Sequence, residues 1–386
     1  MSGVRTFSSS AITAGAPSLC ADPYEQGREL GVACAEQVRA TLGRYRELWA
    51  FFGVTEGDIR RVGTAVLDPI RAYAPGLSEE MRGIAAGAGL AQWEVGALNA
   101  RTELLALGHG LMEECTTCVL VADDSPPLTV QTWDWYDSLV DSWFVWTLPR
   151  PDGGSLNTLT EYGIVGKIGV SSAGVSVHFN ALRHRRDRGD GGVPVHVVAR
   201  RVLEEAESVD EAVQIAGAAE VSASSSVTVT GPSGEGDGWD VVSIELHPGG
   251  PAVVSRAPDA VSLVHTNHFV AAEVGEDDQV RRPLSTTYER FDLATASLTT
   301  RPPADRDALA GALATHELGP HGTCAHSLPG APLDERGATL AVVVTEPATG
   351  RMGVHAGGAC TAGPQQWTEF GGSRVAKSGA SEPAFG

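Results

Sequence analysis

The sequence predicts an α+β protein in which helices and strands form separate layers. Apolar residues recur at helical spacing through most of the first 110 residues. After Cys115 the period changes to short apolar or alternating runs, which are typical of strands. The later elements come in blocks of strands, helices and strands, without the regular strand-helix alternation of a doubly wound parallel sheet.

The N-terminal third is expected to be almost wholly helical. Residues 1–18 are rich in Ser, Ala and Gly, and we expect them to be frayed. Ser78 can cap the helix that follows it, because its hydroxyl can accept a bond from a free N–H of the first turn. The predicted helices cover residues 22–42, 56–73, a stretch from 78 onward, and 91–107.

The rest of the chain predicts strands with three inserted helices. Residues 123–127 contain two acidic residues and two prolines between apolar runs, a pattern that indicates a hairpin. Ser208 and Glu211 form a capping box at the start of a helix. The tail 372–386 is small and polar, and it is expected to be disordered. Strands are predicted at 119–122, 128–132, 143–148, 156–161, 174–180, 226–230, 241–246, 253–255, 339–346 and 352–355, and helices at 194–206, 209–219 and 303–316.

Length, charge and cysteine content limit the classes of function that the protein can have. At 386 residues the chain can form one large domain or two ordinary ones. The formal charge of −20 disfavours nucleic-acid and anionic-membrane partners, because like charges repel. No apolar run is long enough for a signal-peptide core or a membrane span, so we expect a cytoplasmic protein. Six cysteines are too few for a disulfide framework in a chain this long.

Cys115, at the point where the period changes, is the candidate nucleophile. A thiol attacks a carbonyl as thiolate, and an ordinary Cys, with a pKa of ~8.5, is mostly protonated at neutral pH. An N-terminal Cys can use its own α-amino group as the base, because that group has a pKa of ~7.7 to 8.0. This base would exist only after cleavage of the chain between Glu114 and Cys115. Self-cleavage would therefore activate the enzyme.

Two short motifs surround Cys115: Glu-Cys-Thr-Thr at 114–117 and Gln-Thr-Trp-Asp at 131–134. With these motifs the chain resembles the isopenicillin N acyltransferase (acyl-CoA:6-aminopenicillanic acid acyltransferase) family, the C45 peptidase-like branch of N-terminal nucleophile hydrolases. The resemblance spans roughly residues 20 to 357. It implies one four-layer αββα domain, made as a precursor and cut into pieces 1–114 and 115–386. Further matching stretches lie at 22–27, 98–103, 161–169, 172–175, 179–182, 192–194, 265–268 and 337–340.

The resemblance also implies roles for single residues. Cys115 corresponds to the nucleophile, Asp134 to the carboxylate that holds the new amino group, and Asn267 to the amide that donates to the oxyanion. Two positions depart from the family. Glu114 stands where the fungal enzyme has Gly, and Ala325 stands where the family commonly has Arg, so that His326 or an Arg elsewhere would supply the positive charge. Five further residues are expected to line the site: Thr116, Asn180, Glu245, His268 and His326.

We therefore predict a self-processing amide hydrolase or N-acyltransferase that works through a Cys115 thioester. Its expected partners are a small amide or N-acyl substrate and its own cleaved N-terminal fragment. No cofactor or metal is expected. One alternative is a retired catalytic fold that only binds. Another is a thiol-redox or zinc protein built on Cys115 and Cys118, although a second C-x-x-C is missing and Cys118 fits an inward-facing strand position.

Overall fold

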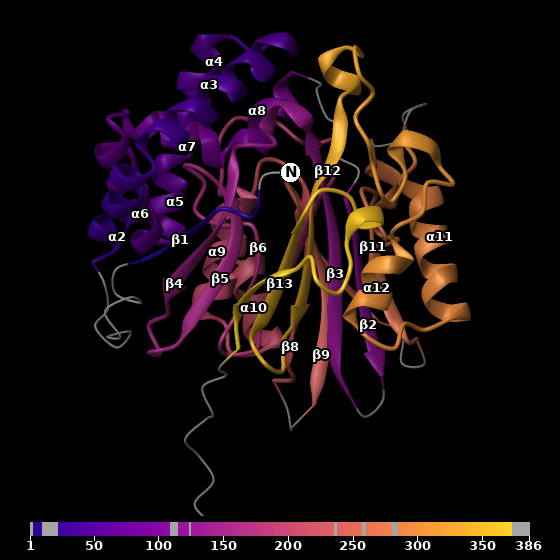
Figure 1. The fold of residues 1–386 in the computed structure, drawn as a ribbon. Helices are drawn as coiled ribbons and strands as arrows, with labels where there is room; N and C mark the ends of the chain where they lie inside the picture. The colour runs from indigo at the N-terminus through magenta and orange to yellow at the C-terminus, as the bar shows by residue number, and fades with distance from the viewer. Residues whose placement is uncertain are drawn as a thin grey trace, which may run out of the picture.

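The computed structural model describes residues 3–9, 22–108, 115–122, 125–234, 238–256, 260–279 and 285–372 (Figure 1). The N-terminal part consists of one short strand, β1 (Thr6–Ser8), and seven helices. These helices are α2 (Pro23–Ala33), α3 (Ala35–Phe51), α4 (Glu56–Ala65), α5 (Leu67–Tyr73), α6 (Pro75–Ala88), α7 (Gln92–Asn99) and α8 (Arg101–Leu107).

One sheet contains eight strands in the order β1-β4-β5-β6-β7-β8-β9-β10. Strand β1 runs parallel to β4, and every other neighbouring pair in this sheet is antiparallel. Its remaining strands are β4 (Trp143–Pro149), β5 (Ser155–Glu161), β6 (Ile168–Ser171), β7 (Ser176–Ala181), β8 (Ser225–Pro232), β9 (Trp239–His247) and β10 (Gly250–Ser255).

The second sheet contains six antiparallel strands in the order β11-β2-β3-β12-β13-β14. Its central pair, β3 with β12, joins two segments that lie far apart in the chain. The strands are β2 (Thr116–Ala122), β3 (Ser125–Tyr136), β11 (Ser262–His265), β12 (Gly337–Glu346), β13 (Arg351–Ala356) and β14 (Thr368–Gly371).

Helices cover the outer faces of both sheets. Helices α9 (Val195–Glu205) and α10 (Val209–Gly217) pack on the first sheet, whose apolar core also includes side chains of the N-terminal helices. Helices α11 (Thr287–Thr300) and α12 (Arg306–Ala312), drawn in orange in Figure 1, pack on the second sheet. The sheets face each other, and polar contacts such as Gln131 Nε2 to the Phe179 carbonyl oxygen (2.6 Å) join them. The predicted αββα layering is confirmed.

The structure corrects several local predictions. Residues 6–8 form β1, so the N-terminal segment is neither frayed throughout nor wholly helical. Ser78 lies inside α6, which begins at Pro75, because proline suits the first turn of a helix. The Ser208 cap is confirmed, since its hydroxyl accepts from the Glu211 N–H at 3.2 Å. Four elements of the structure were not predicted from the sequence: β6, β11, α11 and β14. Of the expected disordered tail, residues 373–386 lie outside the described residues.

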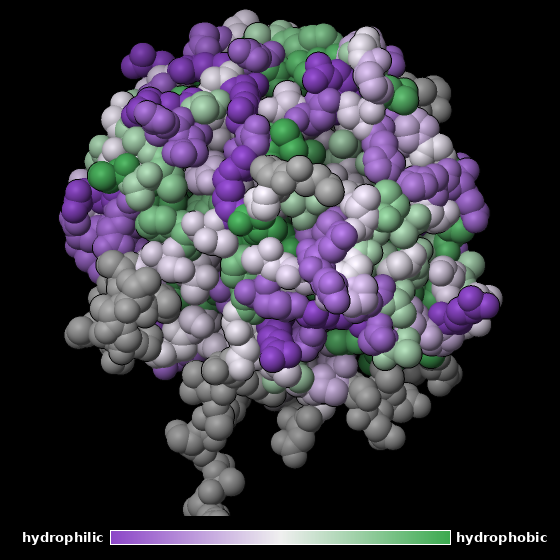
Figure 2. All heavy atoms as spheres, viewed as in Figure 1, coloured by the Kyte–Doolittle hydropathy of each residue, from purple (hydrophilic) through white to green (hydrophobic). Residues whose placement is uncertain are grey.

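The face shown in Figure 2 mixes hydrophilic side chains with small hydrophobic patches. Among the described residues, no helix is both long enough and apolar enough to cross a membrane. Buried ion pairs join the N-terminal helices to the rest of the domain. Arg200 on α9 donates to both carboxylate oxygens of Glu80 on α6, at 2.9 and 3.0 Å, and both side chains are buried.

Candidate active site

Cys115 lies immediately before β2, a strand in the interior of the second sheet. Its side chain is only 5 % exposed, and its Sγ lies 3.6 Å from the carbonyl oxygen of Asp134 on the neighbouring strand β3. The thiol therefore lies between the two sheets, at the residue before β2. This is the point at which the sequence changes from helical to strand periodicity. Glu114, the other half of the expected cleavage site, lies outside the described residues.

Arg290 is the cation of this site. Its Nη1 donates to the Cys115 carbonyl oxygen and to Thr116 Oγ1, both at 2.9 Å, and its Nη2 donates to Asn267 Oδ1 at 3.0 Å. Its Nε donates to Thr286 Oγ1 at 3.1 Å. The guanidinium is fully buried, so these charge-assisted bonds act with little competition from water.

The family pattern places an arginine near position 325, whereas the arginine that contacts Cys115 is at position 290. Arg290 is carried by α11, a helix that was not predicted. A signal existed, because Thr287, Arg290, Ala294 and Leu298 are buried at intervals of three and four residues, as on one face of a helix. Two of the four are polar, so these positions do not form an apolar repeat in the sequence.

Asn180 contacts the Cys115 backbone directly, and Asn267 is linked to it through Arg290. Asn180 Nδ2 donates to the Cys115 carbonyl oxygen at 2.9 Å, and Asn180 Oδ1 accepts from Thr117 Oγ1 at 2.8 Å. Asn267 follows β11, and its Nδ2 donates to the Ala181 carbonyl oxygen at 3.1 Å. Because Arg290 holds Asn267 Oδ1, the orientation of this side-chain amide is set by hydrogen bonds at both ends.

Asp134 is 2 % exposed and pairs with Thr339 of β12. Side chains alternate along a strand, so its carboxylate points to the face opposite Trp133 and Trp135. On that face lies Cys324, whose pKa is raised to about 12 chiefly by burial. The Cys360 N–H lowers this pKa, whereas the Cys360 side chain and, least, the Asp134 charge raise it. The contact that joins Asp134 to the Cys115 thiol is made by its backbone carbonyl.

A buried charged network adjoins Trp133 and Trp135. Lys167 Nζ lies 2.7 Å from Glu161 Oε2 and 3.7 Å from the centre of the Trp133 ring. Burial and the Arg101 charge lower the pKa of Lys167 to about 7, although Glu161 and Cys115 act in the opposite direction. Lys167 was not among the residues predicted from the sequence. A buried amine that titrates near neutral pH can carry a proton.

The other residues expected to line the site are distributed around it. Glu245 Oε1 lies 2.8 Å from His265 Nε2, and the carboxylate accepts from the N–H groups of Val270 and Ala271, so it holds the loop that carries Asn267. His268 Nδ1 lies 3.1 Å from Thr287 Oγ1. Burial, followed by the charges of His265 and Arg290, lowers the pKa of His268 to about 4, so its ring is neutral at pH 7.

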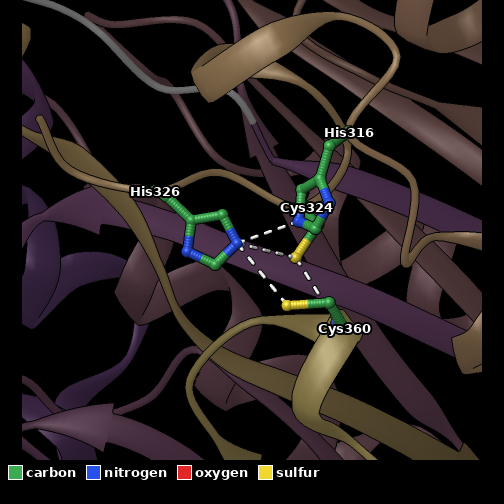
Figure 3. A group of neighbouring side chains, drawn as sticks. All are labelled: His316, Cys324, His326 and Cys360. Carbon is green, nitrogen blue, oxygen red and sulfur yellow. Dashed lines mark hydrogen bonds between the residues drawn. The ribbon is translucent and has the colours of Figure 1, made fainter.

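His326 belongs to a different group of side chains. Its Nε2 lies 3.0 Å from His316 Nε2 and 3.5 Å from the sulfurs of Cys324 and Cys360 (Figure 3). Arg290, and not His326, is thus the positively charged residue that contacts the Cys115 backbone. The catalytic roles assigned to Cys115, Asp134 and Asn267 stay predictions.

The two cysteines of the C-x-x-C motif face opposite sides of β2. Cys118 is fully buried in the apolar cluster between the second sheet and its helices, and burial raises its pKa to about 12. Thr117, one residue before it, faces Asn180 in the other sheet. Within the part of the chain that the structure describes, neither Cys115 nor Cys118 belongs to a group of potential metal ligands. The inward-facing strand position expected for Cys118 is confirmed.

Comparison with known proteins gives the following matches. A family model described as acyl-coenzyme A:6-aminopenicillanic acid acyl-transferase matches residues 121–359. The acyl-coenzyme A:6-aminopenicillanic-acid-acyltransferase 40 kDa form of Emericella nidulans is 30% identical over 239 residues, 61% of this chain and 63% of that protein. The match thus spans less than two thirds of this relative's length.

Two solved structures are also similar to this chain. Penicillin V acylase from Agrobacterium tumefaciens has a TM-score of 0.36 and 15% identity, and the match covers 63% of this chain and 83% of that one. A mutant of the conjugated bile acid hydrolase from Clostridium perfringens has a TM-score of 0.45 and 10% identity, and the match covers 67% of this chain and 92% of that one.

Proposed function

Because this chain belongs to the acyl-coenzyme A:6-aminopenicillanic acid acyl-transferase family, we propose that it cuts or transfers the acyl group of a small amide through a thioester on Cys115. The observation that carries the proposal is the convergence of Arg290, Asn180 and Asn267 on the start of β2. Arg290 and Asn180 each donate to the Cys115 carbonyl oxygen at 2.9 Å, and Arg290 also binds Asn267. These donors hold the nucleophile next to an oriented side-chain amide.

In the proposed reaction the α-amino group of Cys115 takes the thiol proton, and the thiolate attacks the amide carbonyl carbon of the substrate. The negative charge on the carbonyl oxygen is stabilised by Asn267 Nδ2, which has a second N–H besides the one bonded to Ala181. The protonated α-amine then gives its proton to the leaving nitrogen, and the C–N bond breaks. Water, or a second amine in the transfer reaction, releases the acyl group from Cys115.

Arg290 acts as a positioning residue in this scheme. Its bonds to the Cys115 carbonyl and to Asn267 Oδ1 keep nucleophile and oxyanion donor in one rigid frame.

The free α-amine requires that the bond between Glu114 and Cys115 be cut, and we propose that the Cys115 thiol makes this cut by an N-to-S acyl shift followed by hydrolysis. The products would be 1–114 and 115–386. We propose that they stay together, because Tyr45 of the first piece accepts from Trp135 Nε1 at 2.9 Å and Glu80 binds Arg200, all in the buried core. Asp134 is proposed to hold the new amino group.

Intact mass under denaturing conditions tests this proposal. The wild type is expected to give two fragments that meet at Glu114 and Cys115, and the Cys115→Ala variant is expected to stay whole. Cys118→Ala is the matched control, since it removes a buried thiol three residues away on the opposite face, and it should cleave like the wild type.

Reaction with an activated acyl ester then distinguishes an enzyme from a protein that has the same fold but only binds its ligand. The wild type should carry one acyl group on the fragment that begins at Cys115, sensitive to hydroxylamine as a thioester is. A wild type that stays whole on long incubation and takes up no acyl group would refute the proposal and favour the binding protein.

A further inference from the structure

Four side chains that could bind a metal ion converge beside the second sheet (Figure 3). They are His316, which follows α12, Cys324 and His326 of the next loop, and Cys360, near the end of the chain. One ligand atom from each lies within 4.8 Å of every other. We propose that these four residues form a structural zinc site.

The three distances from His326 are close to those of a tetrahedral site. Zinc bonds of ~2.3 Å to sulfur and ~2.05 Å to nitrogen give tetrahedral edges of about 3.6 Å between N and S and about 3.3 Å between two nitrogens. His326 Nε2 lies 3.5 Å from Cys324 Sγ, 3.5 Å from Cys360 Sγ and 3.0 Å from His316 Nε2. Small side-chain movements would therefore let all four atoms bind one ion.

The surrounding backbone supports the sulfur ligands. The Cys360 N–H donates to Cys324 Sγ at 3.4 Å, a bond that stabilises a thiolate. Gly358 lets the chain pass close to this sulfur, because a Cβ at that position would lie only 2.8 Å from Cys324 Sγ. A larger residue would force the loop away from the four ligands.

The donor set identifies the ion and its role. Two thiolates and two imidazoles in a tetrahedral arrangement favour Zn²⁺ over Mg²⁺ or Ca²⁺, which take oxygen ligands. Binding would release the two thiol protons to solvent, so that two negative charges balance the ion. Four protein ligands leave no open position for substrate, which makes the site structural.

The site would stiffen the surroundings of Cys115 through two short routes. Thr339 exchanges hydrogen bonds with Ala325, its Oγ1 accepting at 2.9 Å and its N–H donating at 3.0 Å, and it pairs with Asp134. Thr286, which binds Arg290 Nε, donates to the carbonyl oxygen of His321. An ion that fixes the loop 316–326 would therefore also restrain the residues that hold Arg290.

Metal analysis of the full chain tests the site. Protein saturated with Zn²⁺ and passed through metal-free buffer should retain about one zinc per chain. The double variant His316→Gln/Cys360→Ser changes two exposed ligands and should retain about a tenth as much or less. The matched control is His321→Gln/Cys34→Ser, which removes the same two residue types outside the group and should bind zinc like the wild type.

Cobalt gives a readout that does not depend on any variant folding. Wild-type protein loaded with Co²⁺ should show thiolate-to-cobalt charge transfer in the near ultraviolet and the visible bands of a tetrahedral ion. Three results would overturn the proposal: no retained zinc and no such spectrum, equal zinc in a folded double variant, or a Cys324–Cys360 disulfide found as the loss of two hydrogens by mass.

Discussion

Replacing Arg290 by Met is expected to slow acylation of Cys115 strongly while the protein still folds. Two of the bonds lost are those to the Cys115 carbonyl oxygen (2.9 Å) and Asn267 Oδ1 (3.0 Å). Hydrogen bonds to a charged group contribute about 1.5 to 3 kcal/mol each. If both act fully on the transition state, their loss amounts to about 3 to 6 kcal/mol, or about 10² to 10⁴ in rate.

The matched control is Arg200→Met. Arg200 is also fully buried and also makes several charged bonds, two to Glu80 and one, at 3.0 Å, to the Val165 carbonyl oxygen. Breaking such a pair costs about 3 to 5 kcal/mol of stability, so this variant should be at least as destabilised as Arg290→Met. It makes no bond to the Cys115 group, so acylation of its folded, cleaved fraction should keep the wild-type rate.

The assay is single-turnover acylation by an activated acyl ester, followed by the mass of the fragment that begins at Cys115. Cleavage is scored separately on the same samples, so that a defect in processing is not counted as a defect in acylation. Wild-type acylation in Arg290→Met would refute the positioning role. An equal fall in the acylation rate of Arg290→Met and Arg200→Met would show that the slower acylation is caused by reduced stability and not by loss of the contact with Cys115.

Two further predictions follow from Asn267 and Glu103. Asn267→Ala should lower kcat of the folded fraction by about 10² to 10³, because it removes a donor to the oxyanion. It should also lower the free energy of unfolding, because Arg290 Nη2 and the Ala181 carbonyl oxygen lose a buried partner. An unchanged kcat would exclude the oxyanion role. Burial raises the pKa of Glu103 to about 7, so the folded state holds its proton to higher pH than the unfolded state, and this contribution to stability is lost as pH rises from 4.5 through 7. In urea unfolding, the free energy of unfolding of the wild type should fall by about 3 kcal/mol between pH 4 and 8, relative to that of Glu103→Gln. The exposed-site control Glu47→Gln should show the same pH dependence as the wild type. Parallel pH profiles for Glu103→Gln and wild type would contradict the shift.

Local patterns were sufficient to predict most elements. Helical spacing and turn residues predicted the N-terminal helices and most strands, because these signals arise within a few residues of the chain. The boundary at Cys115 was also visible as a change from helical to strand period. Short edge strands such as β14, and the helix α11 with its partly polar buried face, have weak local signals and were missed.

The sequence by itself determined the layered class of the protein, the position of Cys115 at the start of a strand and the identities of Asp134 and Asn267 as candidates. Only the tertiary structure placed Arg290 against Cys115 and joined His316 and Cys360 to the loop of Cys324. These residues are far apart in the chain, and their contacts depend on how α11 packs on the second sheet and on where the segment after β13 lies. Periodicity shows which face of a helix or strand is buried. Tertiary packing decides which distant side chains meet on that face.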